Sequence, residues 1–225
     1  PLYTGLLTPQ GKVLFDLIMW QSPLGLMAET ELTRVPDLIK RLTLYKLRAD
    51  MVLADASDQF AVAVAFGAEP GFSADPRHPD LPYRALVTKP TDLDAVDDAF
   101  RAARIKLGVA ELDDFDIDGT FWLETGARDQ GGVDFDKGCY VGQEQTSRMQ
   151  HRGTVKKGFL TFQVDGPLPE RGTPITANDR TLGDTRSAAD GHLLGFVRYE
   201  KLQDALDAGH DLRAGDAVLT RLSNG

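Results

Sequence analysis

The sequence of 225 residues has a single cysteine, Cys139, and no long apolar run. One thiol excludes an internal disulfide framework and a zinc site built from several cysteines, and it is typical of a reducing compartment. No stretch reaches the roughly 18 apolar residues that identify a membrane-spanning helix. The sequence starts at Pro1 without a methionine, so we expect that an N-terminal portion of the natural protein precedes it.

Basic residues are also scarce. Lysine and arginine number 25 against 34 acidic residues, a formal net charge of −9, which argues against general affinity for nucleic acids. Hydrophobic residues make up 42% and charged residues 26% of the chain, as in globular domains and unlike disordered ones. The four histidines show no metal-ligand spacing, and we expect no stably bound metal.

One segment is cationic against this acidic background. From Lys137 to Lys157, five basic residues stand against one acid, Glu144, which is a net charge of +4. Such a segment either binds an anionic partner or pairs its charges within the fold. The residues alone leave both interpretations open.

Hydrophobic periodicity predicts a chain of strands and helices that ends in a small β-barrel or sandwich. Before residue 110, the expected strands cover 6–8, 12–20, 25–30, 47–53, 60–66 and 83–87, and the expected helices cover 33–45 and 91–107. From residue 153 onward, the expected strands cover 154–164, 173–176, 193–199 and 217–222, and one helix covers 201–208. The proline-rich segment 67–82 is expected to be a loop.

The densest group of unusual residues runs from Lys137 to Glu144 and reads KGCYVGQE. Its two glycines, four residues apart, allow the backbone to approach a ligand closely. Cys139 lies between them, and a nearby cation such as Lys137 or Arg148 favours the reactive thiolate. A free cysteine is, however, often a small buried hydrophobic residue, and from the residues alone that alternative also stands.

The KGCYVGQE segment resembles the K-G-C-Y-x-G-Q-E signature of the YgfZ family, folate-binding proteins related to the T-protein (aminomethyltransferase) of the glycine cleavage system. The similarity extends to 132–135, 147–153, an early hairpin at 5–12 and a barrel segment at 191–200, and so covers essentially the whole chain. The resemblance implies a role in iron–sulfur cluster assembly or repair and a link to tRNA modification. For a bacterial member it implies a cytoplasmic location.

The resemblance also implies a fold. T-protein relatives have two α+β domains around a central folate channel, closed by a C-terminal β-barrel. In this sequence, the first domain is expected at 1–46 plus 111–152, the inserted second domain at 47–110, and the barrel at 153–225.

Two acidic positions carry the resemblance to the folate site. Glu124 lies in a Leu-Glu-Thr-Gly segment similar to the L-E-A-G of T-proteins, where a glutamate binds the pterin end of folate. A carboxylate suits that role because it accepts two parallel hydrogen bonds. T-proteins carry an Asp-Asp pair where this sequence has Phe15 and Asp16, and one of these acids assists one-carbon transfer. The two side chains of a strand pair point to opposite faces, so which acid was lost stays open.

Cys139 is characteristic of the YgfZ pattern and absent from the T-protein pattern. It is expected to carry the function, either as a redox thiol or as a transient cluster ligand. One cysteine cannot hold a cluster alone, because iron–sulfur clusters usually take four protein ligands. The other residues that the resemblance places at the site are Lys137, Tyr140, Gln143, Glu144, Arg148 and Arg152. The two arginines suit the anionic glutamate tail of folate, and the tyrosine either stacks on the ligand or packs in the core.

Three hypotheses follow. The leading one is a tetrahydrofolate-binding protein that assists iron–sulfur cluster assembly or repair, with the assembly machinery or its client enzymes as partners and Cys139 essential. The alternative is a tetrahydrofolate-dependent aminomethyl- or methyltransferase, although Phe15 argues against a classical aminomethyltransferase. The third is an RNA-associated factor that contacts tRNA through the basic stretch 148–157, against which the net charge of −9 argues.

Overall fold

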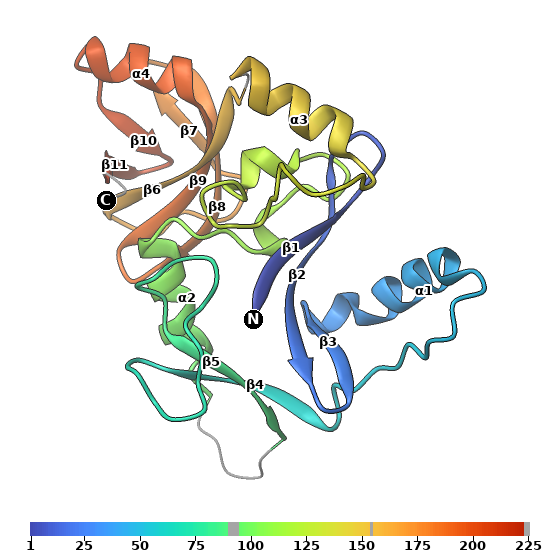
Figure 1. Ribbon diagram of the computed structural model, residues 1–225. Helices are drawn as coiled ribbons and strands as arrows, with labels where there is room; N and C mark the ends of the chain where they lie inside the picture. The colour runs from blue at the N-terminus through green and yellow to red at the C-terminus, as the bar shows by residue number, and fades with distance from the viewer. Residues whose placement is uncertain (90–94, 154, 223–225) are drawn as a thin grey trace.

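The computed structural model describes residues 1–89, 95–153 and 155–222. The chain begins with an antiparallel sheet of order β1-β2-β3, formed by β1 (Leu2–Leu7), β2 (Val13–Ser22) and β3 (Gly25–Glu29) (Figure 1). Gly11 closes the first turn at a φ of +77°, a conformation that glycine adopts without steric cost. The predicted turn and the strands around it are confirmed.

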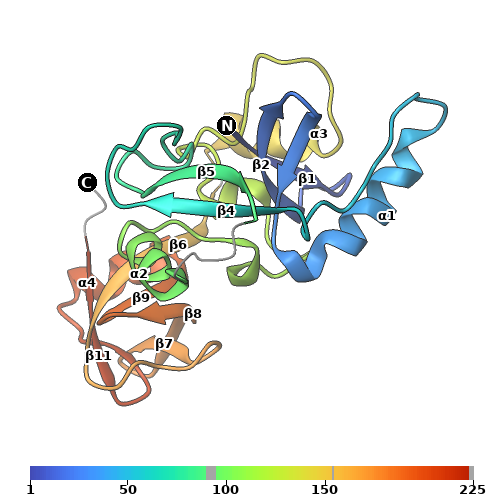
Figure 2. The same cartoon turned by 90° about the horizontal axis from the view of Figure 1, so that it is seen from below.

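Helix α1 (Val35–Lys46) follows a short 3-10 helix, η1 (Leu32–Arg34), and extends outward from the body of the molecule (Figures 1 and 2). The strand predicted over 47–53 is wrong, because this segment is irregular. Its alternating residues Leu47 and Met51 are exposed, and in the described structure the segment joins no sheet. Alternation favours a strand only where a neighbouring strand and a core receive it.

Strands β4 (Phe60–Ala65) and β5 (Tyr83–Thr88) form a separate antiparallel pair. The loop 66–82 joins them and contains the whole of the loop predicted over 67–82, while the strand predicted to end at residue 66 ends at residue 65. Helix α2 (Asp97–Lys106) follows and is shorter than the helix predicted over 91–107, of which residues 91–94 lie outside the described residues.

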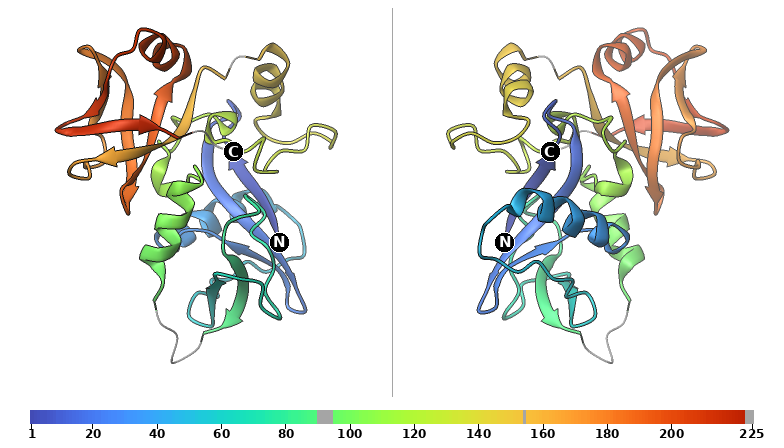
Figure 3. Two further views of the ribbon diagram at one scale, coloured as in Figure 1. Left: turned by 90° about the vertical axis from the view of Figure 1, so that its left-hand side faces the viewer. Right: turned by 90° about the vertical axis from the view of Figure 1, so that its right-hand side faces the viewer.

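Six strands close into a β-barrel of order β10-β11-β6-β9-β8-β7 (Figure 3). The strands are β6 (Lys157–Asp165), β7 (Pro174–Ala177), β8 (Arg180–Ala189), β9 (His192–Arg198), β10 (Leu212–Ala214) and β11 (Ala217–Arg221). Helix α4 (Tyr199–Asp207) follows β9. The sequence predicted the helix and all strands but β8 and β10. In β8, Gly183 and Asp184 interrupt the apolar alternation, and β10 has only three residues.

Two 3-10 helices and one α-helix lie between α2 and the barrel: η2 (Leu112–Asp114), η3 (Trp122–Thr125) and α3 (Gln143–Arg152). Hydrophobic periodicity did not reveal α3, because only Thr146 and Met149 of this helix are buried. Gly142, at a φ of +89°, precedes it, and a Cβ there would lie 2.7 Å from the carbonyl oxygen of Thr8. This close approach seats the start of α3 on the β1–β2 turn.

One hydrophobic core joins the N-terminal sheet to the barrel. In it, the ring of Phe159 lies 5.6 Å from that of Phe115 and 4.8 Å from that of Phe196, between centroids. A second core, around Phe162 and Leu193, fills the barrel interior. The proposed domain division at residues 46, 110 and 152 stays a prediction. Among the described residues, no helix has the length and apolar character needed to cross a bilayer.

Candidate functional site

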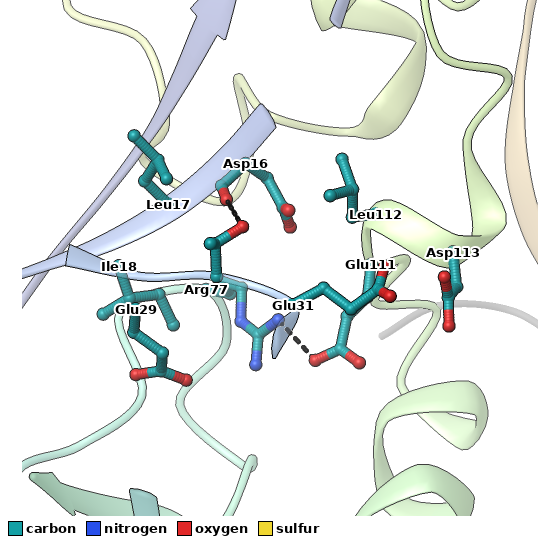
Figure 4. Close-up of a pocket in the computed structure, with 10 residues that line it drawn as sticks. Asp16, Leu17, Ile18, Glu29, Glu31, Arg77, Glu111, Leu112 and Asp113 are labelled. Carbon is teal, nitrogen blue, oxygen red and sulfur yellow. Dashed lines mark hydrogen bonds and ion pairs between the residues drawn. The ribbon is translucent and has the colours of Figure 1, made fainter. Parts of the chain in front are cut away.

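A cavity of about 200 Å³ lies beside β2, where the N-terminal sheet meets the loop 66–82 and η2 (Figure 4). Its charged lining is five carboxyl groups and one guanidinium: Asp16, Glu29, Glu31, Glu111, Asp113 and Arg77. A ligand in this cavity meets mainly hydrogen-bond acceptors. The lining therefore favours a group that is cationic or rich in N–H donors.

Asp16 is the buried carboxyl group of this cavity that has no ion-pair partner among the described residues. The residue is 8% exposed, and burial raises its pKa to about 7, with the Glu111 carboxylate adding to the shift and Arg77 opposing it. Its backbone carbonyl accepts a hydrogen bond from Thr30 Oγ1 at 3.2 Å, drawn as a dashed line in Figure 4. Among the described residues, no other residue donates a hydrogen bond to its carboxyl oxygens. The group is therefore available to a ligand.

Arg77 is held in the cavity wall by acids on both sides. Its Nη1 lies 2.8 Å from Glu111 Oε1, and its Nη2 lies 2.9 Å from Asp75 Oδ2. Arg84 Nη2 lies 2.7 Å from the same Asp75 oxygen. Burial would raise the pKa of Glu111, but Arg77 and other nearby arginines hold it below its usual value. This network fixes the loop 66–82 against the start of η2 and keeps Glu111 anionic.

The face of the sheet that carries Asp16 contains further groups of interest. Asp16 is paired with Gly5, and Tyr3 lies on the same face, opposite Ile18. Tyr3 is 2% exposed, and its hydroxyl has no hydrogen-bond partner among the described residues. Phe15 points the other way, into the main core. Of the two neighbours, Asp16 lines the cavity and Phe15 does not.

Glu124 lies apart from this cavity, in η3. The residue is 5% exposed, its Oε2 accepts a hydrogen bond from the Phe121 amide at 3.0 Å, and Lys157 Nζ lies 3.7 Å away. Burial raises its pKa, while the Phe121 amide and Lys157 oppose the shift. Glu124 thus caps its own helical turn and is not among the residues that line the Asp16 cavity.

The KGCYVGQE segment forms an exposed loop that leads into α3. Cys139 is exposed, so the interpretation of Cys139 as a buried hydrophobic residue is wrong. Lys137 Nζ lies 4.6 Å from the centroid of the Tyr140 ring, and the Tyr140 amide donates a hydrogen bond to Gln143 Oε1 at 3.0 Å. These contacts hold the loop on both sides of Cys139, and the exposed thiol is accessible to a partner.

The remaining predicted residues lie on α3 or at its end. Arg148 Nη2 lies 2.8 Å from Glu144 Oε1, one helical turn away, and both side chains are exposed. Arg152 is also exposed. The positive charge of this segment is therefore paired in part within the helix and open to solvent elsewhere.

The structure does not gather the predicted folate residues in one place. Of the eight residues predicted to bind folate, only Asp16 lines the cavity. Sequence reasoning missed Arg77 and Glu111, which no motif marks and which lie 61 and 95 positions after Asp16. The sequence offered one signal for them, namely that Arg77 is a charged residue in the predicted loop 67–82 and Glu111 begins an acidic segment after the helix predicted over 91–107. In the parts of the chain that the structure describes, no group of three or more acidic, histidine or cysteine side chains is arranged to hold a metal ion.

Together these elements define a T-protein-like fold, a mixed α and β body closed by a six-stranded C-terminal barrel, as predicted. The structure is similar to that of the glycine cleavage system aminomethyltransferase T from Bartonella henselae, with a TM-score of 0.67 over 98% of this chain and 74% of that chain. The sequences are 12% identical, so this likeness concerns the fold alone. Residues 156–222 match the family model described as CAF17, C-terminal beta-barrel domain.

Sequence relatives share one description. The chain is 31% identical over 192 residues to the iron–sulfur cluster assembly factor IBA57 homolog, mitochondrial, of Mycosarcoma maydis, covering 75% of this chain and 48% of that protein. It is 29% identical over 265 residues to the corresponding protein of Pyricularia oryzae, covering 93% and 67%. With IBA57 of Mus musculus it shares 27% identity over 242 residues, covering 91% and 66%. The chain thus spans about half to two thirds of the length of these relatives.

These similarities bear on two predictions. The resemblance to the YgfZ family is supported at a coarser level, as similarity to assembly factors for iron–sulfur clusters. The predicted bacterial cytoplasmic location is wrong, because the similar proteins are described as mitochondrial.

Proposed function

We propose that this protein is an iron–sulfur cluster assembly factor of the YgfZ type, in which Cys139 contacts the cluster in transit. The observation that carries the proposal is the exposure of Cys139 on a braced loop with an intact KGCYVGQE sequence. A cysteine thiolate is an iron ligand, and an exposed one can reach a cluster held by another protein. Because one cysteine is too few for a resident cluster, the partner or a small thiol supplies the other ligands. The similarity to IBA57 supports this role.

The test is a comparison of wild type, Cys139→Ser and the neighbouring control Val141→Ala. We expect Cys139→Ser to lower the activity of iron–sulfur enzymes in cells that lack the wild-type protein. In vitro, it should also remove the spectral change that appears when wild type is mixed with a cluster-loaded carrier protein. Val141→Ala should behave as wild type. Full function of Cys139→Ser in both assays would overturn the proposal.

We further propose that the cavity at Asp16 binds the pterin ring of tetrahydrofolate. Pterins present amino and ring N–H donors, which match the acceptor-rich lining and the unpartnered Asp16 carboxyl group. The volume of about 200 Å³ lies below the roughly 300–1,000 Å³ of sites for whole drug-sized ligands. The cavity thus suits the ring alone, with the glutamate tail outside it.

Calorimetry with tetrahydrofolate tests this second part. Loss of the Asp16 carboxylate should weaken binding at least about tenfold, which corresponds to one charge-assisted hydrogen bond. The test variant is Asp16→Asn. The control is Asp129→Asn, because the Asp129 side chain is 86% exposed. Equal binding by both variants, or no binding by wild type, would reject the folate site and leave the Cys139 proposal standing.

A tetrahydrofolate-dependent aminomethyl- or methyltransferase is the second candidate function. Its support is the pKa of Asp16, raised by burial to about 7, which suits a general acid or base near neutral pH. This candidate requires folate-dependent turnover of an amine or methylated substrate. Turnover must be lost in Asp16→Asn and kept in Cys139→Ala, and the opposite pattern excludes it.

An effect on tRNA modification would follow indirectly, through enzymes that need clusters. The net charge of −9 disfavours direct contact with tRNA. The modified-nucleoside content of bulk tRNA in cells carrying Cys139→Ser tests the indirect route. Salt-titrated binding of purified tRNA tests the direct one.

A further inference from the structure

Exposed apolar side chains are concentrated in one short part of the chain. Among the described residues, 16 large hydrophobic side chains are exposed, and eight of them lie between residues 24 and 52. Five of the eight belong to the end of α1 and the residues after it: Leu44, Tyr45, Leu47, Met51 and Val52. Concentrated apolar exposure of this kind is typical of an interaction surface.

Helix α1 contacts the core through its first two turns, up to Leu42. Leu38 is its one buried residue, at 5% exposure, and Leu42, one turn later, packs partly against the main core. Tyr45, next on the same stripe, is 53% exposed. Figures 1 and 2 both show the helix extending away from the body. The apolar stripe of α1 therefore continues past the point where this chain covers it.

Two of the exposed apolar side chains near the end of α1 follow a cation by one helical turn. Lys40 lies one helical turn before Leu44, and Arg41 lies one turn before Tyr45, with its guanidinium 5.8 Å from the ring centroid. Residues 40–48 contain four cations and no acid, in a chain of net charge −9. A helix that lies on a membrane separates its cationic and apolar faces. Mixing the two on one face suits a protein groove that is apolar inside and acidic at its rim.

Leu47 adds a second kind of observation. It ends α1 at a φ of 50° and a ψ of −114°, a region that is strained for a residue with a branched side chain. Its side chain is 86% exposed, so burial within this chain does not offset the strain. Strained residues cluster at sites of binding, and a partner that buries Leu47 would supply the missing contact.

A second copy of this chain is a poor candidate for the partner that binds the exposed end of α1. Of the cavities in the described structure, the one of about 440 Å³ is bordered by Arg180, Lys201 and His210 with one acid, Asp204, and this net positive rim repels a cationic helix. The acidic cavity beside Asp16, at about 200 Å³, is too small to admit a helix end with its side chains. The cavity of about 330 Å³ carries one acid and one cation, Glu200 and Arg221, and so has no acidic rim to attract the helix.

We propose that residues 40–52, the exposed helix end, dock into the apolar, acid-rimmed groove of a partner protein. The docking uses neither Cys139 nor the Asp16 cavity, so it is tested independently of the proposed function. Leu44 and Leu47 supply the apolar contacts, and Lys40 and Arg41 pair with the acidic rim.

The test compares wild type with the double variant Leu44→Glu/Leu47→Glu and with the control Leu168→Glu, whose leucine is 46% exposed elsewhere on the surface. A photo-crosslinking amino acid at position 44, and at position 168 as control, first identifies the partner in cells. That partner is then purified and titrated with each variant at low and high salt. We expect an acidic partner that binds wild type and Leu168→Glu equally, binds the double variant at least tenfold more weakly, and loses affinity with salt.

Four outcomes would overturn the proposal. The first is that no crosslink is specific to position 44, and the second is that the double variant binds the purified partner as well as wild type does. The third is that wild type self-associates with increasing concentration and the double variant does not. The fourth is that wild type binds vesicles of phosphatidylcholine and phosphatidylglycerol and the double variant does not. The third would identify a second copy as occupant, and the fourth a membrane surface. Unchanged far-ultraviolet circular dichroism and unchanged alkylation of Cys139 show that the double variant remains folded.

Discussion

Arg77 Nη1 lies 2.8 Å from Glu111 Oε1 in the wall of the cavity that holds Asp16. The pair joins a loop between two strands to the start of η2, and Asp75 holds the other side of the guanidinium. One buried arginine therefore neutralises two carboxylates and moderates the pKa of a third, that of Asp16. The stability and the chemistry of the cavity depend on the same side chain.

Replacing Arg77 by methionine should destabilise the protein by about 3–5 kcal/mol at pH 7, because it leaves buried carboxylates without a partner. The same change should raise the pKa of Asp16 further, since Arg77 now lowers it. Urea unfolding measures the first effect. The control Arg148→Met removes an exposed pair with Glu144 and should cost less than about 1 kcal/mol. Equal losses in the two variants would contradict the structural role of Arg77.

Asp16 should make stability depend on pH. In the unfolded chain an aspartate ionises near pH 3.9, whereas folded Asp16 ionises at about 7. Between these values the folded state holds the extra proton, so this contribution to stability is present at low pH and is lost as the pH rises. Asp16→Asn removes the effect. It should be more stable than wild type by up to roughly 4 kcal/mol at pH 8, and the gap should close toward pH 4.

Urea unfolding at pH 4.5, 6 and 8 measures this dependence. Asp129→Asn, at an exposed position, serves as the control and should show no such trend. A stability difference between Asp16→Asn and wild type that stays constant across the three pH values would show that Asp16 ionises normally in the folded protein.

Two glycines should respond differently to alanine. In β8, a Cβ on Gly183 would lie 2.7 Å from Val197 Cα and press on the carbonyl oxygen of Phe196, both of them backbone atoms of β9. Gly183→Ala should therefore cost about 3 kcal/mol, at the upper end for overpacking. Gly138, next to Cys139, has open space around its Cβ position, and Gly138→Ala should leave thermal stability nearly unchanged. Comparable losses in melting temperature would be inconsistent with the closed barrel.

Substitutions of Glu124 should separate capping from ligand binding. Glu124→Ala removes the acceptor of the Phe121 amide and should cost about 1–2 kcal/mol of stability, as lost helix caps do. Glu124→Gln keeps an acceptor oxygen and should cost less. Because Glu124 does not line the cavity, both variants should weaken tetrahydrofolate binding less than Asp16→Asn does. Complete loss of binding in Glu124→Gln alone would place the pterin at Glu124 instead.

Local patterns accounted for most of the regular structure. The strands of the barrel with clear alternation, such as β6 and β9, and the helix α4 were predictable because their apolar residues already show which face is buried. Helix α3 was not, since only two of its residues are buried. The segment 47–53 was misread because its alternation has no strand to pair with in the described structure.

Local patterns in the sequence predicted strands, helices and a terminal barrel or sandwich. The resemblance of KGCYVGQE to the YgfZ family predicted the α+β fold with a barrel and Cys139 as the residue to test. Periodicity and a motif are both visible in the sequence because each consists of residues that are close together in the chain. The tertiary structure decided that Cys139 is exposed, that Asp16 meets Arg77 and Glu111, and that Glu124 lies elsewhere. Exposure and charge pairing depend on which distant segments pack together, and only a folded chain brings side chains 61 and 95 positions apart into one cavity.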